Sequence, residues 1–136
     1  METLKAGCFL RNKANNKIAL IYREKQKDLT FPKGHLEENE DLKTCAIRET
    51  AEETKRVAAI VDKYEPYVER YTTPKGKKCV CYMYIAVDCG VSDNSSTDTH
   101  ELRWTDIEAV ENLLSYPTLK EAWKYAKPRI LEILNS

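Results

Sequence analysis

Three glutamates stand close together in the sequence, at spacings that would make them neighbours on a helix. Glu49, Glu52 and Glu53 lie three and four residues apart, so their side chains would be adjacent on a helix surface. Like charges at this spacing repel and destabilise the helix that carries them. Because clustered carboxylate oxygens suit hard divalent cations, the pattern predicts a site for Mg²⁺ or Mn²⁺.

A helix over residues 39–55 must position these carboxylates, and its apolar residues indicate which way they point. Asn39 is a favourable N-cap for this helix. At about 100° per residue, Glu49 and Glu53 continue the apolar side of the helix. That side consists of Leu42, Cys45 and Ala46. Unpaired buried carboxylates are costly, so both must be protonated, paired or bound to a cation. The alternative, a charged surface helix without a site, does not fit their inward placement.

The composition predicts one folded domain that acts on a charged small molecule. The 136 residues are 42% hydrophobic and 32% charged, which favours a single domain over residues 1–136 with its own core. The formal net charge is zero, which argues against a general nucleic-acid or membrane binder. Acidic residues gather between positions 37 and 53, and basic residues gather elsewhere. This distribution fits a metal centre that acts on a polyanion.

The cysteines and the absence of long apolar runs indicate the compartment. Five cysteines without a CxxC pair predict free buried thiols in a reducing environment, since a zinc site would need a second pair. No apolar run is long enough to span a bilayer, and the N-terminus does not resemble a signal peptide. We therefore expect an intracellular protein, cytoplasmic or nuclear, whose oligomeric state the sequence leaves open.

Strands and loops are predicted on both sides of the acidic helix. The predicted strands are residues 6–10, 17–22, 29–31, 57–71 (one long or one interrupted strand), 78–87 and 102–105. Pro32 and Gly34 are expected to start a loop, and residues 88–99 to form another. A β-rich order with interposed helices is typical of an α/β or α+β layered domain.

Two capping boxes are predicted to open helices in the C-terminal part of the chain. Thr105 with Glu108 would begin a short helix, and Thr118 with Glu121 would begin a terminal helix. The apolar face of the terminal helix is Leu119, Ala122, Trp123, Ala126 and Ile130. Pro128 is expected to interrupt this helix or to split it in two.

The spacing of the acidic residues resembles the Nudix box. That motif has Gly, five residues, Glu, seven residues and then Arg-Glu-x-x-Glu-Glu. The matching positions are Gly34, Glu40, Arg48, Glu49, Glu52 and Glu53. The flanking elements fit as well, so the resemblance covers nearly the whole chain. It implies an α/β/α sandwich around a mixed sheet, with the box as a loop–helix–loop, and a hydrolase of nucleoside diphosphates linked to another group that uses Mg²⁺ or Mn²⁺.

The resemblance also implies roles for single residues. Glu49 and Glu53 are similar to metal ligands of the family, and the carbonyl of Gly34 is similar to a further ligand. Glu52 matches another ligand or the base that activates water, and members of the family differ over which glutamate is that base. Arg48 is similar to a residue that orients the glutamates, with a phosphate contact as the second reading.

Other acidic residues and one departure from the motif leave alternatives open. Asp98 or Glu101 can supply the additional carboxylate that many family members use, and Glu40 is expected to be structural. The family usually has glycine where this chain has Lys55. That glycine ends the helix in a left-handed conformation, which costs another residue roughly 1 kcal/mol. A non-catalytic Nudix-like binding module is the alternative that this departure raises, but such a module should have lost the glutamates first.

Short segments are similar to particular subfamilies. Residues 31–35 and 100–104 resemble the asymmetric dinucleoside tetraphosphate hydrolases, and residues 78–82 resemble their strand whose lysine meets phosphate and whose tyrosine meets adenine. The tail 126–129 resembles the diphosphoinositol polyphosphate phosphohydrolases, and residues 45–49 resemble the mRNA decapping enzymes. The substrate contacts that these likenesses imply are Lys33, His35, Lys78, Tyr82, His100 and Lys127.

We therefore expect a metal-dependent pyrophosphohydrolase that cleaves diadenosine polyphosphates, diphosphoinositol polyphosphates or both by water attack on phosphorus. Its partner would be a small-molecule polyphosphate. The alternatives within the same class are a hydrolase of the nucleotide pool and a hydrolase of the mRNA cap, for which capped RNA would be the substrate.

Overall fold

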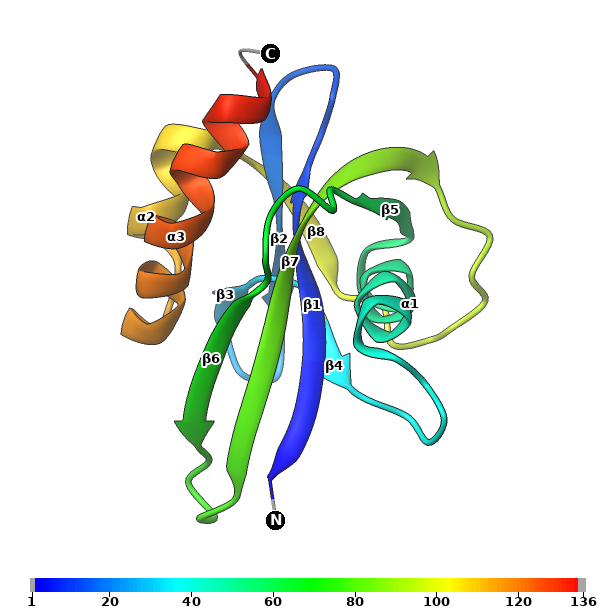
Figure 1. Ribbon diagram of the computed structural model, residues 1–136, viewed down its shortest axis with the longest axis vertical. Coiled ribbons are helices and arrows are strands. Elements are labelled where there is room, and N and C mark those ends of the chain that lie inside the picture. The colour runs from blue at the N-terminus through cyan, green and yellow to red at the C-terminus, as the bar shows by residue number, and fades with distance from the viewer. Residues whose placement is uncertain (1, 135–136) are drawn as a thin grey trace.

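A mixed sheet of eight strands separates helix α1 from helices α2 and α3 in the computed structural model, which describes residues 2–134 (Figure 1). The strands are β1 (Thr3–Arg11), β2 (Lys17–Arg23), β3 (Asp28–Thr30), β4 (Lys33–His35), β5 (Arg56–Ile60), β6 (Tyr67–Thr72), β7 (Lys78–Val91) and β8 (Glu101–Asp106). The helices are α1 (Leu42–Thr54), α2 (Val110–Leu113) with the 3-10 turn Ile107–Ala109 before it, and α3 (Pro117–Leu134). The predicted α/β/α arrangement with a mixed sheet is confirmed.

Two long parallel strands, β1 and β7, form the centre of the sheet, and each changes partner along its length. β1 pairs with β4 near its start and with β2 near its end, and β7 pairs first with β6 and then with β5. The close approach of β4 requires Gly7, because a Cβ there would lie 2.1 Å from the carbonyl oxygen of Pro32. The chain therefore leaves the sheet at the end of β4, beside the central strand β1, and enters the loop before α1.

The two faces of the sheet carry different side chains. On the face toward α2 and α3, large residues such as Phe9, Phe31 and Met83 pack around Trp123. On the face toward α1, the buried residues are mostly small, with Ala6, Cys8, Leu10, Ala19, Tyr84 and Ala86 under Cys45 and Ala46 of the helix. Small side chains allow a helix to approach a sheet closely, and this brings the acidic end of α1 down to β4.

Several predicted strand boundaries differ from the structure. The interrupted alternative for residues 57–71 is correct, because β5 and β6 pair with different halves of β7. The prediction of a loop from Pro32 onward is wrong at β4, where pairing with β1 overrides the turn signals of Pro32 and Gly34. The loop predicted over residues 88–99 begins only at residue 92, since β7 continues to Val91.

The predicted helix boundaries also need correction. The N-cap of α1 is Asp41, whose carboxylate accepts a hydrogen bond from Thr44 N at 2.7 Å. Asn39 instead adopts a φ of 63° in the preceding turn. Neither capping box forms: Thr105 lies inside β8, and Thr118 lies inside α3, which begins at Pro117. A proline is well suited to the first position of a helix because its missing N–H would be unpaired there.

Pro128 does not interrupt α3, which is continuous from residue 117 to residue 134. A proline inside a helix disturbs the backbone bonds of the preceding turn. Here the guanidinium of Arg129 donates to the carbonyl of Tyr125 at 2.7 Å and lies over the ring of the same residue. The packing of the apolar face and this side-chain bond keep the helix whole.

All five cysteines are free, as predicted, but only four of them are buried. Cys89 is exposed near the end of β7. No helix among residues 2–134 combines the length and the hydropathy that crossing a membrane would require.

A buried ion pair fixes β5 to β7 immediately after the acidic helix, and we expect its loss to destabilise the fold. Arg56 donates to both carboxylate oxygens of Asp88, at 2.9 and 2.6 Å, and the side chain of Asp88 is 6% exposed. Removing one partner of such a pair leaves a buried charge alone. Arg56→Met should lower the free energy of unfolding by about 2 kcal/mol, measured by urea denaturation.

The matched control for this substitution is Arg103→Met, which removes an arginine from an exposed pair with Glu101. Exposed pairs contribute roughly 0–1 kcal/mol. Equal losses in the two variants would show that the Arg56–Asp88 pair contributes nothing specific.

Candidate active site

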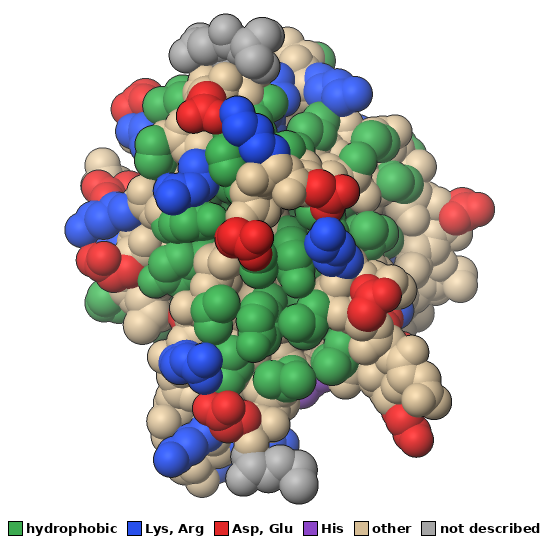
Figure 2. All heavy atoms as spheres, viewed as in Figure 1, with side chains coloured by type: hydrophobic (Ala, Val, Ile, Leu, Met, Phe, Trp, Pro, Cys, Tyr) green, Lys and Arg blue, Asp and Glu red, His purple; other side chains and the backbone are tan. Residues whose placement is uncertain are grey.

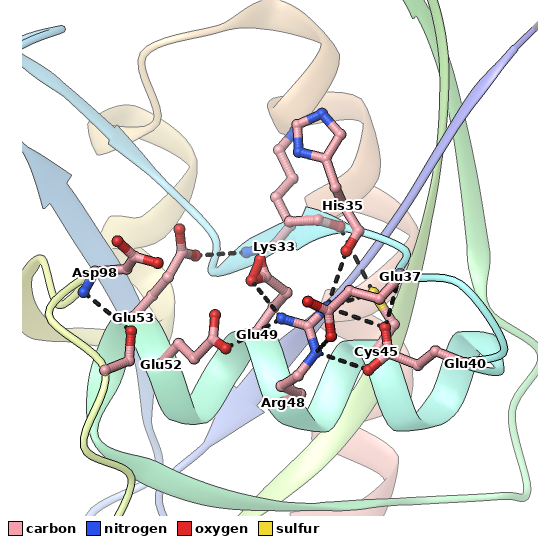
Figure 3. A network of polar contacts seen from close by, with 12 residues as sticks. Lys33, His35, Glu37, Glu40, Cys45, Arg48, Glu49, Glu52, Glu53 and Asp98 are labelled. Carbon is pink, nitrogen blue, oxygen red and sulfur yellow. Dashed lines mark hydrogen bonds and ion pairs between the residues drawn. The ribbon is translucent and has the colours of Figure 1, made fainter.

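Arg48 gathers the carboxylates of the acidic helix and of the loop before it. Its guanidinium donates to both oxygens of Glu40, at 2.7 and 3.0 Å, and one nitrogen reaches Glu49 and Glu52, each at 3.1 Å. It also donates to the carbonyl of His35 at 2.9 Å (Figure 3). These bonds lower the pKa of Glu40 to about 2. One side chain thus closes the loop onto α1 and sets the direction of two glutamates.

Glu49 lies directly against the backbone of β4. A Cβ on Gly34 would fall 1.3 Å from Oε2 of Glu49, so only glycine leaves room for this carboxylate. The carbonyl of Gly34 lies near α1, where the Cys45 thiol donates to it at 3.7 Å. The structure therefore places the carboxylate of Glu49 against the Cα of Gly34, the residue whose carbonyl the resemblance predicts as a further ligand.

Glu53 is held by the residue that precedes Gly34 in β4. Its carboxylate accepts a hydrogen bond from the backbone N–H of Lys33 at 2.8 Å, and Nε2 of His100 lies 3.6 Å away. The side chains of Glu49 and Glu53 are 12% and 14% exposed, and that of Glu52 is 19% exposed. The predicted inward placement of Glu49 and Glu53 is confirmed, and Glu52 beside them is slightly more exposed.

Burial makes these carboxylates reluctant to ionise together. Burial, together with Glu52, raises the pKa of Glu49 to about 7, against the opposing pull of Arg48. Burial and the charge of Glu49 raise the pKa of Glu53 to about 8, although the N–H of Lys33 favours its charged form. Carboxylates in such surroundings gain from a nearby cation, because it removes the repulsion between them.

The oxygen donors at this end of α1 fit a hard divalent cation such as Mg²⁺ or Mn²⁺. They are three clustered carboxylates and one backbone carbonyl, with only part of their charge balanced by Arg48. Among the described residues 2–134, however, no three acidic, histidine or cysteine side chains already converge as a ligand set. The carboxylates turn toward Arg48 and Lys33 N instead, so binding of a cation would require them to turn away from these partners.

A cavity of about 450 Å³ opens beside Glu49 and Glu53. Its lining residues are Glu24, Lys25, Gln26, Glu49, Glu53, Thr97, Asp98, Thr99 and His100. Asp98 lies above the end of α1 that carries Glu52 and Glu53 (Figure 3). Glu101 lines a neighbouring cavity of about 440 Å³ and pairs with Arg103. Of the two predicted extra carboxylates, the structure thus places Asp98, not Glu101, in the cavity with the motif glutamates.

The side chain of Lys33 extends away from Glu53, to the face of the sheet that carries α3. Its ammonium lies 3.4 Å from the buried Glu69 and 5.1 Å from the ring centre of Tyr71. The ammonium of Lys5 lies 5.5 Å from the same ring. Seen from the side of Figure 1, hydrophobic side chains gather over the middle of the molecule, with charged ones among them (Figure 2). An aromatic ring flanked by two ammonium groups therefore borders the backbone that holds Glu53.

Sequence reasoning missed this group of residues. One signal could have revealed this group. β6 carries a carboxylate between two tyrosines in alternating positions, at Tyr67, Glu69 and Tyr71, and side chains in alternating positions of a strand point to one face. An acid on an otherwise apolar face requires a partner. Its partner, Lys33, belongs to the motif segment, but the sequence does not show that the two meet.

The predicted substrate contacts do not all come together. His35 is exposed next to Lys33, and partial burial and the charges of Lys5 and Lys77 lower its pKa. Lys78 is exposed at the start of β7. Tyr82 packs against the hydrophobic cluster under α1, on the face opposite Tyr71. Lys127 pairs with Glu108 at 2.9 Å in a groove between α2 and α3, and none of the motif glutamates lines that groove.

Fold and site together define the class of this protein. A three-layer α/β/α sandwich presents a glutamate-rich loop–helix–loop at the centre of a mixed sheet. A model of the NUDIX domain family matches residues 1–127 of the 136, and the chain therefore belongs to the Nudix hydrolase family, whose members act on phosphoanhydride bonds.

Known relatives and structures agree with this assignment. The 8-oxo-(d)GTP phosphatase of Mycolicibacterium smegmatis is 30% identical over 104 residues, which are 76% of this chain and 31% of that protein, so the chain spans about a third of this relative. The structure of an Ap4A hydrolase from C. elegans in a binary complex has a TM-score of 0.78 at 20% identity and covers 96% of this chain and 98% of its own. A NUDIX hydrolase from Nitrosomonas europaea has a TM-score of 0.74 at 16% identity, with 91% and 87% covered.

We expect Gly34→Ala to disable the site without unfolding the protein. The new methyl group would occupy the position of the Glu49 carboxylate, which would have to turn away from β4. Affinity for Mn²⁺, measured by isothermal titration calorimetry, should fall at least about tenfold, as is common when the surroundings of a metal ligand change. Gly76→Ala is the control: a Cβ there would meet nothing within 4 Å, and although alanine is strained at the φ of 83°, the substitution changes no contact of Glu49. Unchanged Mn²⁺ affinity in Gly34→Ala would contradict the placement of Glu49.

We also expect Glu53 to make the metal-free protein less stable as the pH rises from about 5 to 8. Its pKa is about 8 in the folded chain and near 4.5 when unfolded. The folded state thus binds more protons in this window, and the free energy of unfolding falls with rising pH. In urea denaturation with EDTA, Glu53→Gln should lose less stability over this range than the wild type. Parallel pH profiles would show that Glu53 is not held in its neutral form.

Proposed function

We propose that this chain, as one domain over residues 1–136, hydrolyses a phosphoanhydride bond in a nucleotide-derived polyphosphate. Diadenosine polyphosphates are the substrate class that the site fits best, and diphosphoinositol polyphosphates are the second. The observation that carries the proposal is the position of Lys33, whose N–H binds Glu53 while its ammonium lies over Tyr71. A phosphate chain that contacts the glutamate site can therefore extend past an ammonium to an aromatic ring.

In this proposal Glu49 and Glu53 share one task, and Glu52 has another. Glu49, Glu53 and the carbonyl of Gly34 would hold a divalent cation, with Glu52 as a further ligand or as the base. A bound Mg²⁺ or Mn²⁺ would neutralise phosphate oxygens and make the attacking water more acidic. Arg48 keeps Glu49 and Glu52 in place through its two bonds of 3.1 Å.

The chemical step is an in-line attack of water on phosphorus. Glu52 lies at the more exposed edge of the cluster, and we assign it to accept the proton of the attacking water. The bond from the water oxygen to phosphorus forms while the bond from phosphorus to the bridging oxygen breaks, and the leaving phosphate takes that electron pair. Asp98, which lines the same cavity as Glu49 and Glu53, would supply an additional carboxylate for the cation.

Aromatic stacking favours adenosine over inositol as the group next to the phosphates. A purine ring stacks on a tyrosine, whereas an inositol ring bears only hydroxyl and phosphate groups. Two ammonium groups beside the ring of Tyr71 suit a base that carries a phosphate chain. The C. elegans Ap4A hydrolase shares the fold over nearly the whole chain. At 20% identity this likeness supports the fold, and the choice of adenosine rests on the ring of Tyr71 and the two ammonium groups beside it.

Hydrolysis of 8-oxo-(d)GTP is a second candidate function, because the M. smegmatis phosphatase is similar over 76% of this chain. An oxidised guanine would use the same aromatic ring, and the carboxylate of Glu69 next to it would accept hydrogen bonds from the base.

The buried thiols support a reducing compartment, and we place the protein in the cytoplasm or nucleus.

A substrate panel with two kinds of variants tests the function. With Mg²⁺, the wild type should turn over diadenosine tetraphosphate, and Glu52→Gln and Glu53→Gln should each lose at least about a hundredfold in kcat, as expected for groups that act in proton transfer or hold the cation. Diphosphoinositol pentakisphosphate, 8-oxo-dGTP and capped RNA complete the panel. No turnover of diadenosine tetraphosphate or diphosphoinositol pentakisphosphate would contradict the proposed substrate classes.

Tyr71→Leu separates nucleotide substrates from inositol substrates. Loss of a stacking platform costs about 1–3 kcal/mol per base, so KM for diadenosine tetraphosphate should rise roughly tenfold or more, while KM for diphosphoinositol pentakisphosphate should stay the same. Tyr82→Leu is the comparison, since Tyr82 lies on the opposite face of the sheet. If Tyr82→Leu alone raised KM, the base would bind on the face toward α1.

A further inference from the structure

Lys55 ends helix α1 in a conformation that lysine does not favour. Its φ is 60° and its ψ is 31°, which is the left-handed region, and its N–H donates to the carbonyl of Ala51 at 3.0 Å. A glycine would make the same turn without the steric cost that a Cβ brings there. The lysine must therefore contribute something that a glycine cannot.

The side chain of Lys55 reaches across to the loop between β7 and β8. Its ammonium donates to the carbonyl of Asn94 at 2.7 Å and to the carbonyl of Ser96 at 2.6 Å. Hydrogen bonds from a charged donor are about twice as strong as neutral ones. The loop itself has no buried side chain between residues 92 and 100, so it lacks core packing that would hold it in place.

The same loop is bound to the end of α1 at three other points. The carbonyl of Lys55 accepts from Ser92 N at 2.9 Å, the carbonyl of Glu53 accepts from His100 N at 3.0 Å, and the carbonyl of Glu52 accepts from the hydroxyl of Thr99 at 3.1 Å. The last carbonyls of a helix have no partners within it. Here the loop satisfies them, and Lys55 holds the middle of the loop between these anchors.

This loop forms one wall of the catalytic cavity. Thr97, Asp98, Thr99 and His100 line the cavity opposite Glu49 and Glu53. Nε2 of His100 approaches Glu53 to 3.6 Å. The residues at the wall follow directly after the two carbonyls that Lys55 binds, so a release of the loop at residues 94 and 96 would move Thr97 and Asp98 before the rest of the wall.

We propose that Lys55 is a positioning residue, which holds the loop of residues 92–100 over the acidic end of α1 so that Asp98 and His100 face Glu53. The proposal rests on the proposed function for its kinetic consequence, but its structural part stands without it. In exchange for the steric cost of a left-handed lysine at the helix end, the loop that lines the site is held in place.

Four variants separate this role from a simple helix cap. Lys55→Met keeps the steric cost of a side chain in the left-handed conformation and loses the ammonium. Lys55→Gly removes both the steric cost and the ammonium. Lys55→Arg keeps two donors in reach of the two carbonyls. Lys43→Met is the control, because it removes another lysine of α1 whose ammonium contacts the exposed Asp62.

The first readout is amide hydrogen exchange of the metal-free proteins, followed at His100 and Ser92. We expect Lys55→Met and Lys55→Gly to exchange at least about tenfold faster than the wild type at these amides, because both charged hydrogen bonds, to Asn94 and to Ser96, are lost. Lys55→Arg and Lys43→Met should stay close to the wild type. This measurement requires neither metal nor substrate, so it is decisive even if the proposed function fails.

The second readout compares thermal stability with activity. Lys55→Gly should melt at or above the temperature of Lys55→Met, because it relieves the left-handed strain, yet both should lose about tenfold in kcat/KM with Mg²⁺ and diadenosine tetraphosphate. Lys55→Arg should recover most of this activity. Wild-type exchange and wild-type activity in Lys55→Gly would overturn the proposal and leave Lys55 as a helix cap, as would activity that simply followed the melting temperature across all variants.

Discussion

The crowding of carboxylates at one end of α1 is the constraint on which the rest of the structure depends. Arg48 balances part of this negative charge, because its guanidinium binds Glu40 on one side and Glu49 and Glu52 on the other. Among residues 2–134 the contacts of Glu53 are instead the N–H of Lys33 at 2.8 Å and the imidazole of His100 at 3.6 Å. Arg48 thus balances part of the negative charge, and the part that it leaves is what a divalent cation would neutralise.

The fold brings this charge to a place where it can be used. Small side chains under α1 let the helix sit close to the sheet, Gly7 lets β4 pair closely with β1, and Gly34 leaves room for the Glu49 carboxylate. A larger side chain at Gly7 would push β4 away from β1, and one at Gly34 would displace Glu49 of α1. The same packing that buries Glu49 and Glu53 raises their pKa values, so the tight core and the unusual electrostatics have a single cause.

Much of this was predictable from sequence, and the failures have physical reasons. Helical periodicity placed Glu49 and Glu53 inward, and the six positions of the motif identified the family. The first predicted capping box does not form because Thr105 belongs to β8, where pairing with β2 outweighs a local cap. The position of Tyr82 relative to Tyr71 depends on which face of the sheet each strand presents. The meeting of Lys33 with Glu69 joins positions 36 residues apart, which periodicity alone cannot reveal.

The three residues of β4 connect the two faces of the molecule. Lys33 binds Glu53 through its N–H and contacts Glu69 and Tyr71 through its side chain. Gly34 makes room for Glu49, and the carbonyl of His35 accepts from Arg48. Three of these contacts involve the backbone of one short strand paired with β1, so the same three residues position Glu49, Glu53 and Arg48. The ammonium of Lys33, by contrast, is carried on a flexible four-carbon stem, so it can turn from Glu69 toward an anionic ligand while its backbone N–H still binds Glu53.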